Sequence, residues 1–498
     1  SRLMPQSAPS IEFEILSNGL GNVAPSPAGT VAIFGTSSGG TAATIGTSPY
    51  RRTQNLVTDY GYGEGIELAA NCIESSIPVI FVKVATNAAG VATGVTFAGT
   101  GTSVMTVTGA PFDSYDEVIV TVTRAGTAGS DPEPGFTISL DGGRTVSREI
   151  RMPANRVYTG LAATTGMTFN FTAATMVVAD TYELSTTAPT WAAADVATAI
   201  AALKASPLNA GMLEVVGPCS KSQSDTIMSA VDDFLARKKF ERMMLCVRDI
   251  NVSGAETEAQ WMTAISTNFS TASSDRMLVW ADPARVQSTI TGTKFRRVGH
   301  IGLVRAGRRS VSRDIGAAED GALCPKYSGT NVSGPLGGTP IDTVYHDEGL
   351  NPGLNENRFA TITTIEGLTG YYVTNPAIMT TPTSDFDLLQ YGRVMDEACR
   401  IANTFFAPKL STDVRLNPTT GFILEKDARS LESGCDSALV RGLVSTGQLS
   451  AVQTTISRVD NINTTKTLTV TIKLQALGYI KTVAITMTFF NPALGNAA

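Results

Sequence analysis

The chain has 498 residues, 43% of them hydrophobic and 16% charged, with a formal net charge of −6. This length exceeds what one hydrophobic core usually organises, so we expect several domains. The acidic balance argues against a dedicated nucleic-acid binder, which needs Lys and Arg to bind phosphate. Two histidines leave little material for histidine-based catalysis or a metal site. Six cysteines lack C-x-x-C spacing, which predicts free thiols: Cys72, Cys219, Cys246, Cys324, Cys399 and Cys435.

The first predicted element is a strand at residues 10–16, where apolar and acidic residues alternate with a period of two. Ile11, Phe13 and Ile15 share one face of this strand. Prolines precede it, and a Gly- and Pro-rich stretch follows it. A strand isolated in this way is typical of an arm, so we predict an N-terminal arm over residues 1–22.

Residues 23–86 follow a strand–loop–helix–strand order. We expect strands at residues 30–34 and 78–84, with a helix at residues 65–75 between them. This order predicts the first part of an α/β body.

The loop after the first of these strands reads GTSSGG and contains the pattern G-x-S-x-G centred on Ser37. In a serine hydrolase this pattern forms a strained turn between a strand and a helix, and an acid and a histidine follow later in the chain. The later residues with that order are Asp282 and then His300 or His346. However, Gly46 and Pro49 interrupt the segment that would have to form the helix.

A phosphate-binding loop is the second interpretation of the same glycines. It requires a lysine directly after them, but Gly40 is followed by Thr41 and no lysine lies near. We therefore favour a tight turn, in which glycine supplies the positive φ. A serine hydrolase that uses Ser37 stays as the alternative from a different class of function.

Residues 87–190 differ in composition, since Gly, Thr, Ala and Ser dominate and lysine is absent. The sequence DGGR at residues 141–144 is a strong turn signal. Short strand-like runs recur at residues 104–107, 118–122, 136–140, 167–171 and 181–184. We predict a small all-β domain inserted into the body. The longest uncharged run, residues 85–112, is rich in Gly, Ala and Thr and predicts no membrane insertion.

The alternation of helices and strands resumes over residues 191–345, the predicted second part of the α/β body. Apolar runs predict strands at residues 212–216, 243–247 and 277–280. Amphipathic segments predict helices at residues 192–204, 222–237 and 256–268. Strands that are apolar throughout and separated by helices are typical of a parallel sheet covered on both faces.

Two charged motifs lie near the end of this part. The first is an arginine cluster that we interpret as a charged patch facing an acidic partner surface: Arg296, Arg297, Arg305, Arg308 and Arg309. The second is the triplet His346-Asp347-Glu348. Adjacent residues do not converge on one ligand, so we expect a solvated loop there and no metal ion.

Residues 346–478 predict a C-terminal α+β domain. The motif SDFD at Ser384 is interpreted as a capping box, which begins a helix that Pro408 ends. The expected elements are two helices and two strands, at residues 388–405, 428–444, 452–459 and 467–476. The second strand has one apolar face, composed of Leu468, Val470, Ile472 and Leu474.

A last strand is predicted at residues 479–490, within a C-terminal arm over residues 479–498. Its apolar face is composed of Val483, Ile485, Met487 and Phe489. Such a strand either closes the sheet of its own molecule or is donated to another one, as in β-augmentation. In a donated strand, three or four buried side chains would contribute several kcal/mol, at about 1.5–3 kcal/mol each as an upper bound. The apolar strand at residues 467–476 is the expected acceptor.

Three regions carry a family resemblance. They are IEFEILSNGLGNVAPSPAGTVAIFGTSSGG near the N-terminus, SLDGGRT with GMTFNFTAATMVVADTYELSTTAP in the insertion, and GYYVTNPAIMTTPTSDFDLLQYGRVMDEACRIAN in the C-terminal part. These regions resemble the sheath proteins of contractile phage tails, in the branch related to Mu-like phages. The third is the most specific, and none of the three is a catalytic motif.

The resemblance implies an α+β multidomain fold: an α/β body, an inserted all-β domain and a C-terminal domain that faces an inner tail tube. It implies a homo-oligomer of stacked hexameric rings linked by strand exchange, which contracts and drives the tube through the host envelope. The implied partners are the tail tube, baseplate and tail terminator proteins. The implied location is the virion tail, after assembly in the host cytoplasm, with no enzyme activity and no cofactor. Another tail component, such as a terminator, is the alternative within the structural class.

Overall fold

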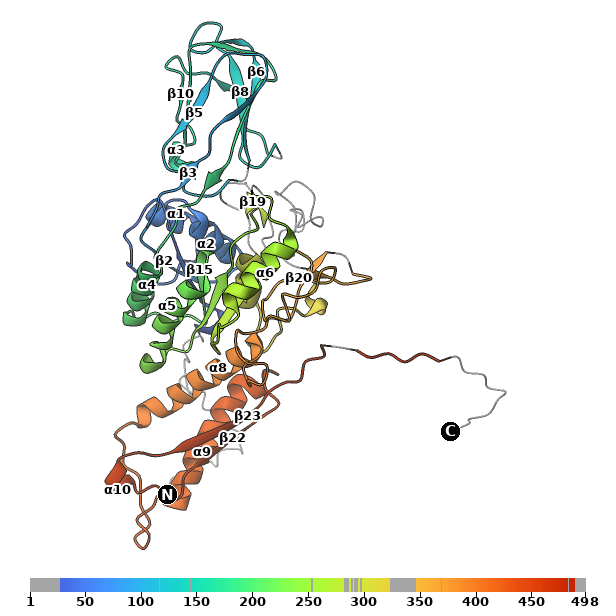
Figure 1. The fold of residues 1–498 in the computed structure, drawn as a ribbon. Helices are drawn as coiled ribbons and strands as arrows, with labels where there is room; N and C mark the ends of the chain where they lie inside the picture. The colour runs from blue at the N-terminus through green and yellow to red at the C-terminus, as the bar shows by residue number, and fades with distance from the viewer. Residues whose placement is uncertain are drawn as a thin grey trace, which may run out of the picture.

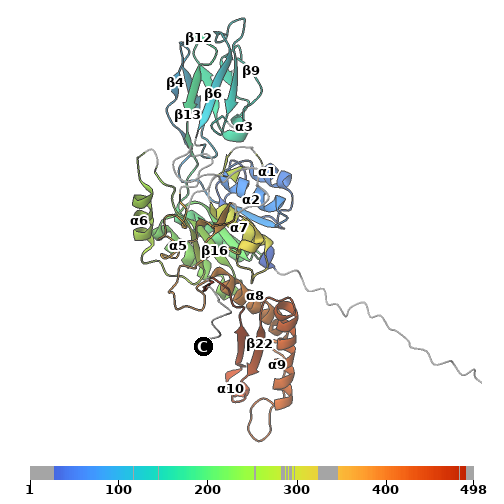
Figure 2. The ribbon, with the colours of Figure 1, turned by 90° about the vertical axis from the view of Figure 1, so that its right-hand side faces the viewer.

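A computed structural model describes residues 27–488 except 116, 144, 252–253, 282–285, 288–289, 291–293, 296–297, 323–345, 369 and 482. The described chain is elongated, with an all-β part at one end, an α/β part in the centre and a helical part with a small sheet at the other end (Figure 1, Figure 2). It combines helices with several separate sheets, as expected of an α+β multidomain protein.

The centre is a five-stranded parallel sheet in the order β17-β16-β15-β1-β2. Its strands are β1 (Val31–Gly35), β2 (Val79–Lys83), β15 (Met212–Pro218), β16 (Arg242–Cys246) and β17 (Met277–Trp280). These strands are buried almost throughout, because helices cover both faces of the sheet. The strands predicted from apolar runs in this part are therefore confirmed.

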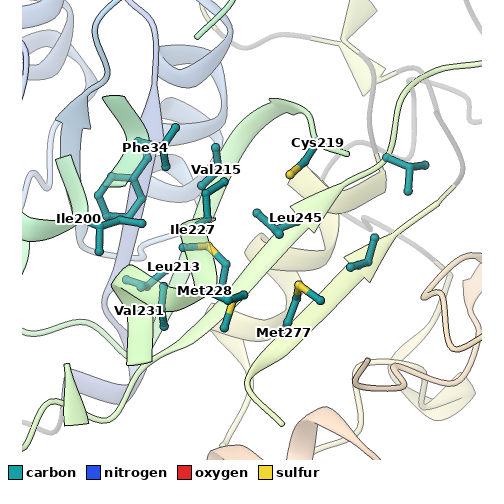
Figure 3. Close-up of a cluster of buried hydrophobic side chains, with 14 of the residues drawn as sticks. Phe34, Ile200, Leu213, Val215, Cys219, Ile227, Met228, Val231, Leu245 and Met277 are labelled. Carbon is teal, nitrogen blue, oxygen red and sulfur yellow. The ribbon is translucent and has the colours of Figure 1, made fainter. Parts of the chain in front are cut away.

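One face of the sheet is covered by α4 (Ala193–Ala205), α5 (Lys221–Asp232) and α6 (Glu258–Phe269). Figure 3 shows the core on this face, where Phe34 and Leu213 from the sheet meet Ile200 and Ile227 from the helices. Capping boxes at Ser220 and Thr257, which were not predicted, begin α5 and α6.

The other face is covered by α2 (Glu64–Glu74) and α7 (Val298–Arg308). The hairpin β20 (Ile362–Thr364) and β21 (Tyr371–Val373) packs into the same core. Further elements on this part of the chain are α1 (Thr53–Tyr60), which was not predicted, and the short hairpin β18 (Val286–Gln287) and β19 (Lys294–Phe295).

Between β2 and α4 the chain forms an all-β unit. A sheet in the order β4-β13-β6-β8-β9 packs against a second sheet, β10-β11-β5, around one hydrophobic core. The elements of this unit are β3 (Val91–Ala92), β4 (Thr96–Ala98), β5 (Met105–Thr108), β6 (Val118–Arg124), β7 (Gly126–Thr127), β8 (Gly135–Ser139), β9 (Ile150–Arg151), β10 (Val157–Tyr158), α3 (Ala162–Thr165), β11 (Thr168–Phe171), β12 (Thr175–Met176), β13 (Thr181–Leu184) and β14 (Thr186–Thr187).

The C-terminal part packs α8 (Leu389–Phe406) beside α9 (Glu425–Leu439), which continues into a π-helical turn. A small sheet follows, formed by β22 (Ala451–Ile456) and β23 (Val470–Gln475), with the short helix α10 (Ile462–Thr465) between them. Both predicted helices and both predicted strands are present, with ends shifted by a few residues.

The capping box predicted at Ser384 is wrong. α8 begins five residues later, and its N-cap residue Leu388 makes no side-chain capping bond. The Ser384 hydroxyl instead donates to Oδ1 of Asp275, at 3.2 Å. The oxygen of the same hydroxyl accepts from the amide of Phe386 at 3.2 Å, so it closes a turn ahead of α8 and does not cap the helix.

Candidate functional site

The strand β23 presents an open edge. Among the described residues it pairs with β22 alone, and Ile472 lies opposite Thr454. The Thr454 amide donates to a helix side chain, so this pair is a non-hydrogen-bonded one. The backbone N–H and C=O of Ile472 therefore point away from β22. The same alternation places the backbone groups of Val470 and Leu474 along this edge.

The opposite edge of the sheet, on β22, is closed by two carboxylates of α9. The amide of Thr454 donates to Oδ1 of Asp436 at 2.7 Å, and the amide of Ile456 donates to Oε1 of Glu432 at 2.8 Å. Arg458 forms an ion pair with Glu432 and holds its pKa below the ordinary value. Because these amides already have acceptors, a further strand would pair at β23 and not at β22.

The same alternation directs the side chains of β23. Val470, Ile472 and Leu474 are half-buried against the helices, whereas the residues between them are exposed. Leu468, just before the strand, packs into the same region. The predicted apolar face is thus present, and its role as an acceptor stays a prediction.

A cavity of about 620 Å³ lies where β23 ends. Its apolar walls come from α8 and from the small sheet with the segments beside it: Tyr391, Val394, Met395, Leu449, Leu474 and Leu477. An added strand could bury side chains at this place without displacing the core.

Beyond Gly478 the described chain forms no strand, although the sequence predicted one at residues 479–490. Figure 1 shows this segment running away from the rest of the molecule. Val483 is 70% exposed, Ile485 75% and Met487 89%. A β-strand requires a partner, and in the single chain none lies beside this segment in the described part. Three of the four predicted apolar residues are thus solvent-exposed.

The remaining residues of the predicted arms lie outside the described residues. These are Ile11, Phe13 and Ile15 of the N-terminal strand, and Phe489 of the C-terminal one. Their pairing stays a prediction.

The arginine cluster does not form one surface patch. Arg305 lies on α7 and is buried, with its guanidinium donating to the carbonyl oxygen of Gly321 at 2.8 Å, so its assignment to a surface patch is wrong. Arg308 and Arg309 are exposed, and Arg309 lies 3.5 Å from Asp320. Arg296 and Arg297 lie outside the described residues.

The Ser37 loop is a turn without a neighbouring acid–histidine pair in the described part of the chain. The Ser37 hydroxyl donates to the carbonyl oxygen of Gly39 at 3.1 Å. No helix follows until α1, and Gly40 has a positive φ of 72°. Asp282 and the side chain of His300 lie outside the described residues. A hydrolase at Ser37 is not favoured by these surroundings.

His346 lies buried between two glutamate side chains, so the expected solvated loop is wrong. Its Nδ1 atom lies 2.9 Å from Oε1 of Glu258 on α6, and its Nε2 atom lies 2.8 Å from Oε2 of Glu348. The imidazole is fully buried. His346 and Glu348 are close in sequence, whereas Glu258 lies 88 positions before His346. The sequence pattern alone did not indicate this contact.

Two classes of site are not found in the described residues. No group of three or more His, Cys, Asp or Glu side chains there is arranged to hold a metal ion. Within the same residues, every helix is too short or too polar to cross a bilayer.

Two family models match this chain. The one described as DUF2586, N-terminal domain, matches residues 75–377, and the one described as DUF2586, C-terminal domain, matches residues 385–494. A comparison with curated proteins gives no match.

Its structural neighbours are tail-sheath proteins and sheaths of contractile injection systems. A sheath tail protein from Listeria innocua has a TM-score of 0.43 at 12% identity, covering 91% of this chain and 96% of that one. A sheath tail protein from Desulfitobacterium hafniense has a TM-score of 0.42 at 14% identity, covering 94% of this chain and 100% of that one. The sheath of an extracellular contractile injection system in its contracted state has a TM-score of 0.45 at 10% identity, covering 99% and 100%.

Proposed function

This chain belongs to the DUF2586 family, and we propose that it is a structural, non-enzymatic subunit of a contractile tail sheath. The observation that carries the proposal is the asymmetry of the C-terminal sheet. The edge of β23 is open, the edge of β22 is closed by carboxylates, and the same chain carries an exposed segment with alternating apolar residues.

In this proposal the C-terminal arm of one copy pairs with β23 of another. About five ladder hydrogen bonds, at a net 0.5–1.5 kcal/mol each, would form along the edge. The side chains of Val483, Ile485 and Met487 leave solvent in the same step, because they alternate with the period of a strand. Since β22 is closed, residues 10–16 of a further copy extend the ladder beyond the first donated strand.

Strand donation of this kind is a head-to-tail contact. Such contacts generate closed rings or open helical filaments, which agrees with stacked hexameric rings around an inner tube. The central α/β part and the β3–β14 unit then lie further from the tube than the C-terminal domain. Contraction would draw on interfaces with two stable arrangements and requires no bound nucleotide. The resemblance in sequence supports the remaining assignments: tail tube, baseplate and terminator as partners, and the virion tail as location.

The test is assembly of truncated and substituted protein, observed by negative-stain electron microscopy. We expect that the full chain forms tubes or rings, and that truncation after Gly478 leaves soluble monomers. Replacing Val483, Ile485 and Met487 by serine should have the same effect. The matched control replaces Ala484 and Thr486, on the other face of the arm, by serine and should still assemble. Regular tubes from the truncated chain would contradict the proposal.

A further inference from the structure

The chain makes specific contacts at the point where the C-terminal arm leaves the folded part. The Tyr479 hydroxyl donates to the carbonyl oxygen of Ser312 at 2.5 Å. The Tyr479 ring meets Tyr391 of α8 edge to face, with ring centroids 5.3 Å apart. The ammonium group of Lys481 forms an ion pair with Asp314. Ser312 and Asp314 follow α7, so residues of two different elements hold the first residues of the arm.

Asp314 is held in place by contacts that do not involve the arm. It is 7% exposed, and its Oδ1 atom accepts a hydrogen bond from the amide of Gly316 at 2.8 Å. Its Oδ2 atom accepts from Nε2 of Gln390, on α8, at 3.1 Å. The Oδ2 atom that pairs with Lys481 is therefore the one that α8 also holds. One carboxylate connects the central α/β part, the C-terminal domain and the arm.

We propose that Ser312, Asp314 and Tyr391 form a root clamp, which fixes the direction in which the C-terminal arm leaves the molecule and ties that direction to the seating of α8. The contribution of the root clamp to assembly rests on the proposed function, whereas its effect on the arm of a single molecule does not.

The arm needs to be held because the residue directly before it is a glycine. Gly478 has no side chain, and a Cβ atom placed there would meet nothing within 4 Å. The backbone at Gly478 can therefore turn in many directions unless later residues are held. With Tyr479 and Lys481 held on both sides of Ile480, the arm is pre-oriented, and less conformational entropy is lost when it docks on a partner.

Gln390 and Tyr391 make the direction of the arm depend on the position of α8. Both residues lie in the first turn of α8: Gln390 donates to Asp314 of the root clamp, and Tyr391, itself part of the clamp, contacts the ring of Tyr479. A shift of α8 against the central part would displace both contacts together. The direction of the arm would then change with the position of the C-terminal domain, which is the coupling that a contracting assembly requires.

Single-molecule energy transfer within isolated monomers tests the root clamp. Dyes are attached through unnatural amino acids at Met487 on the arm and at the exposed Ser229 on α5, at concentrations too low for assembly. The wild-type chain should give one narrow distribution of transfer efficiency. The double variant Tyr479→Phe/Lys481→Ala should at least double its width, and Asp314→Asn should broaden it as well. Lys481→Arg should retain the narrow distribution. The matched control is Lys473→Ala, which removes an exposed lysine of β23 and should change nothing.

The proposal is overturned if the double variant and the wild-type chain give distributions of transfer efficiency that are equally wide. Thermal unfolding of each variant checks that the folded part is intact. The result is independent of the proposed function. A broadened distribution together with tubes from the chain truncated after Gly478 would retain the root clamp and reject strand donation by the C-terminal arm. An unchanged distribution together with monomers from the truncated chain would retain strand donation and reject the root clamp.

Discussion

The Nε atom of Arg242, on β16, lies 2.8 Å from Oδ2 of Asp396, on α8, and both side chains are almost fully buried. Arg276 approaches the other oxygen of Asp396, at 3.2 Å. Burial lowers the pKa of Arg242, and the neighbouring carboxylate of Asp396 opposes this shift. This ion cluster joins the central sheet to the C-terminal domain. A buried charge retained between two domains is costly unless its partner stays in place, so the contact favours one seating of α8.

Removing the carboxylate that Arg242 and Arg276 share should weaken the contact between the central sheet and α8. We expect Asp396→Ala to lower the free energy of unfolding by about 3–5 kcal/mol, because two arginines would remain buried without their carboxylate. Urea unfolding followed by tryptophan fluorescence measures the change, since Trp191, Trp261 and Trp280 lie in the central part. Asp385→Ala, at an exposed position shortly before α8, is the control and should change stability by less than about 0.5 kcal/mol. Equal effects of the two substitutions would refute this role of Asp396.

A glycine on α8 gives the Arg242 guanidinium its space. A Cβ atom at Gly392 would overlap that group. Alanine is normally the better helix former, yet we expect Gly392→Ala to destabilise the protein by about 1–3 kcal/mol, because the arginine must leave its ion pair. Gly478→Ala, at a position with open space, should be close to neutral in the same urea titration. A stabilised Gly392→Ala variant would show that Arg242 has room to move.

Glu241 should make stability depend on pH. It is buried beside the ion cluster, and burial raises its pKa from 4.5 to about 7. Between these values the folded chain holds a proton that the unfolded chain has lost, so this contribution to stability falls as pH rises from about 4.5 to 7. The full effect is about 3 kcal/mol at most.

The measurement compares wild type with Glu241→Gln in urea titrations at several pH values. The glutamine variant should lose this part of the pH dependence, so that the difference between the two proteins changes steadily across the window. Glu256 and Glu348, whose pKa values are lowered, change their contributions at lower pH and are common to both proteins. Parallel curves across the window would refute the prediction.

Opening the closed edge of the small sheet should produce incorrect assembly. In the double variant Glu432→Ala/Asp436→Ala, the amides of Thr454 and Ile456 lose their acceptors and become available to other strands. We expect irregular aggregates in place of tubes, detected by light scattering and electron microscopy. Glu425→Ala, on the same helix and also paired with Arg458, leaves both amides covered and should assemble normally. Regular tubes from the double variant would show that these carboxylates do not protect the edge.

The parts of the fold that were predicted correctly depend on local patterns. The parallel strands were predicted correctly because they are apolar runs, as for residues 243–247, which overlap β16 (Arg242–Cys246). Period-two alternation correctly assigned the buried face of β23. Such features can be predicted from one segment alone, because the spacing of its apolar residues shows which side chains are buried.

The incorrect predictions involve contacts between distant segments. Ser384 has the residues of a capping box around it, but its hydroxyl donates to Asp275 and accepts from the amide of Phe386, and α8 begins only at Leu389. Arg305 looked like part of a surface patch, because the sequence did not reveal that α7 turns it toward the backbone near Gly321. The closure of β22 was missed too, although Glu432 and Asp436 are four residues apart and so share a helix face. That spacing shows which face the carboxylates occupy, but not which strand lies beside it.

The crossing of arms between copies is the central claim, and isotope-resolved cross-linking measures it most directly. Equal amounts of ¹⁵N-labelled and unlabelled protein, both with a photoreactive amino acid at position 485, are mixed as monomers, assembled and irradiated. We predict that the arm links to the peptide containing β23, and that about half of these links join a labelled peptide to an unlabelled one, as statistical strand exchange between neighbours requires. Links that join only peptides of the same isotope would mean that each arm folds onto its own molecule, and would contradict the account.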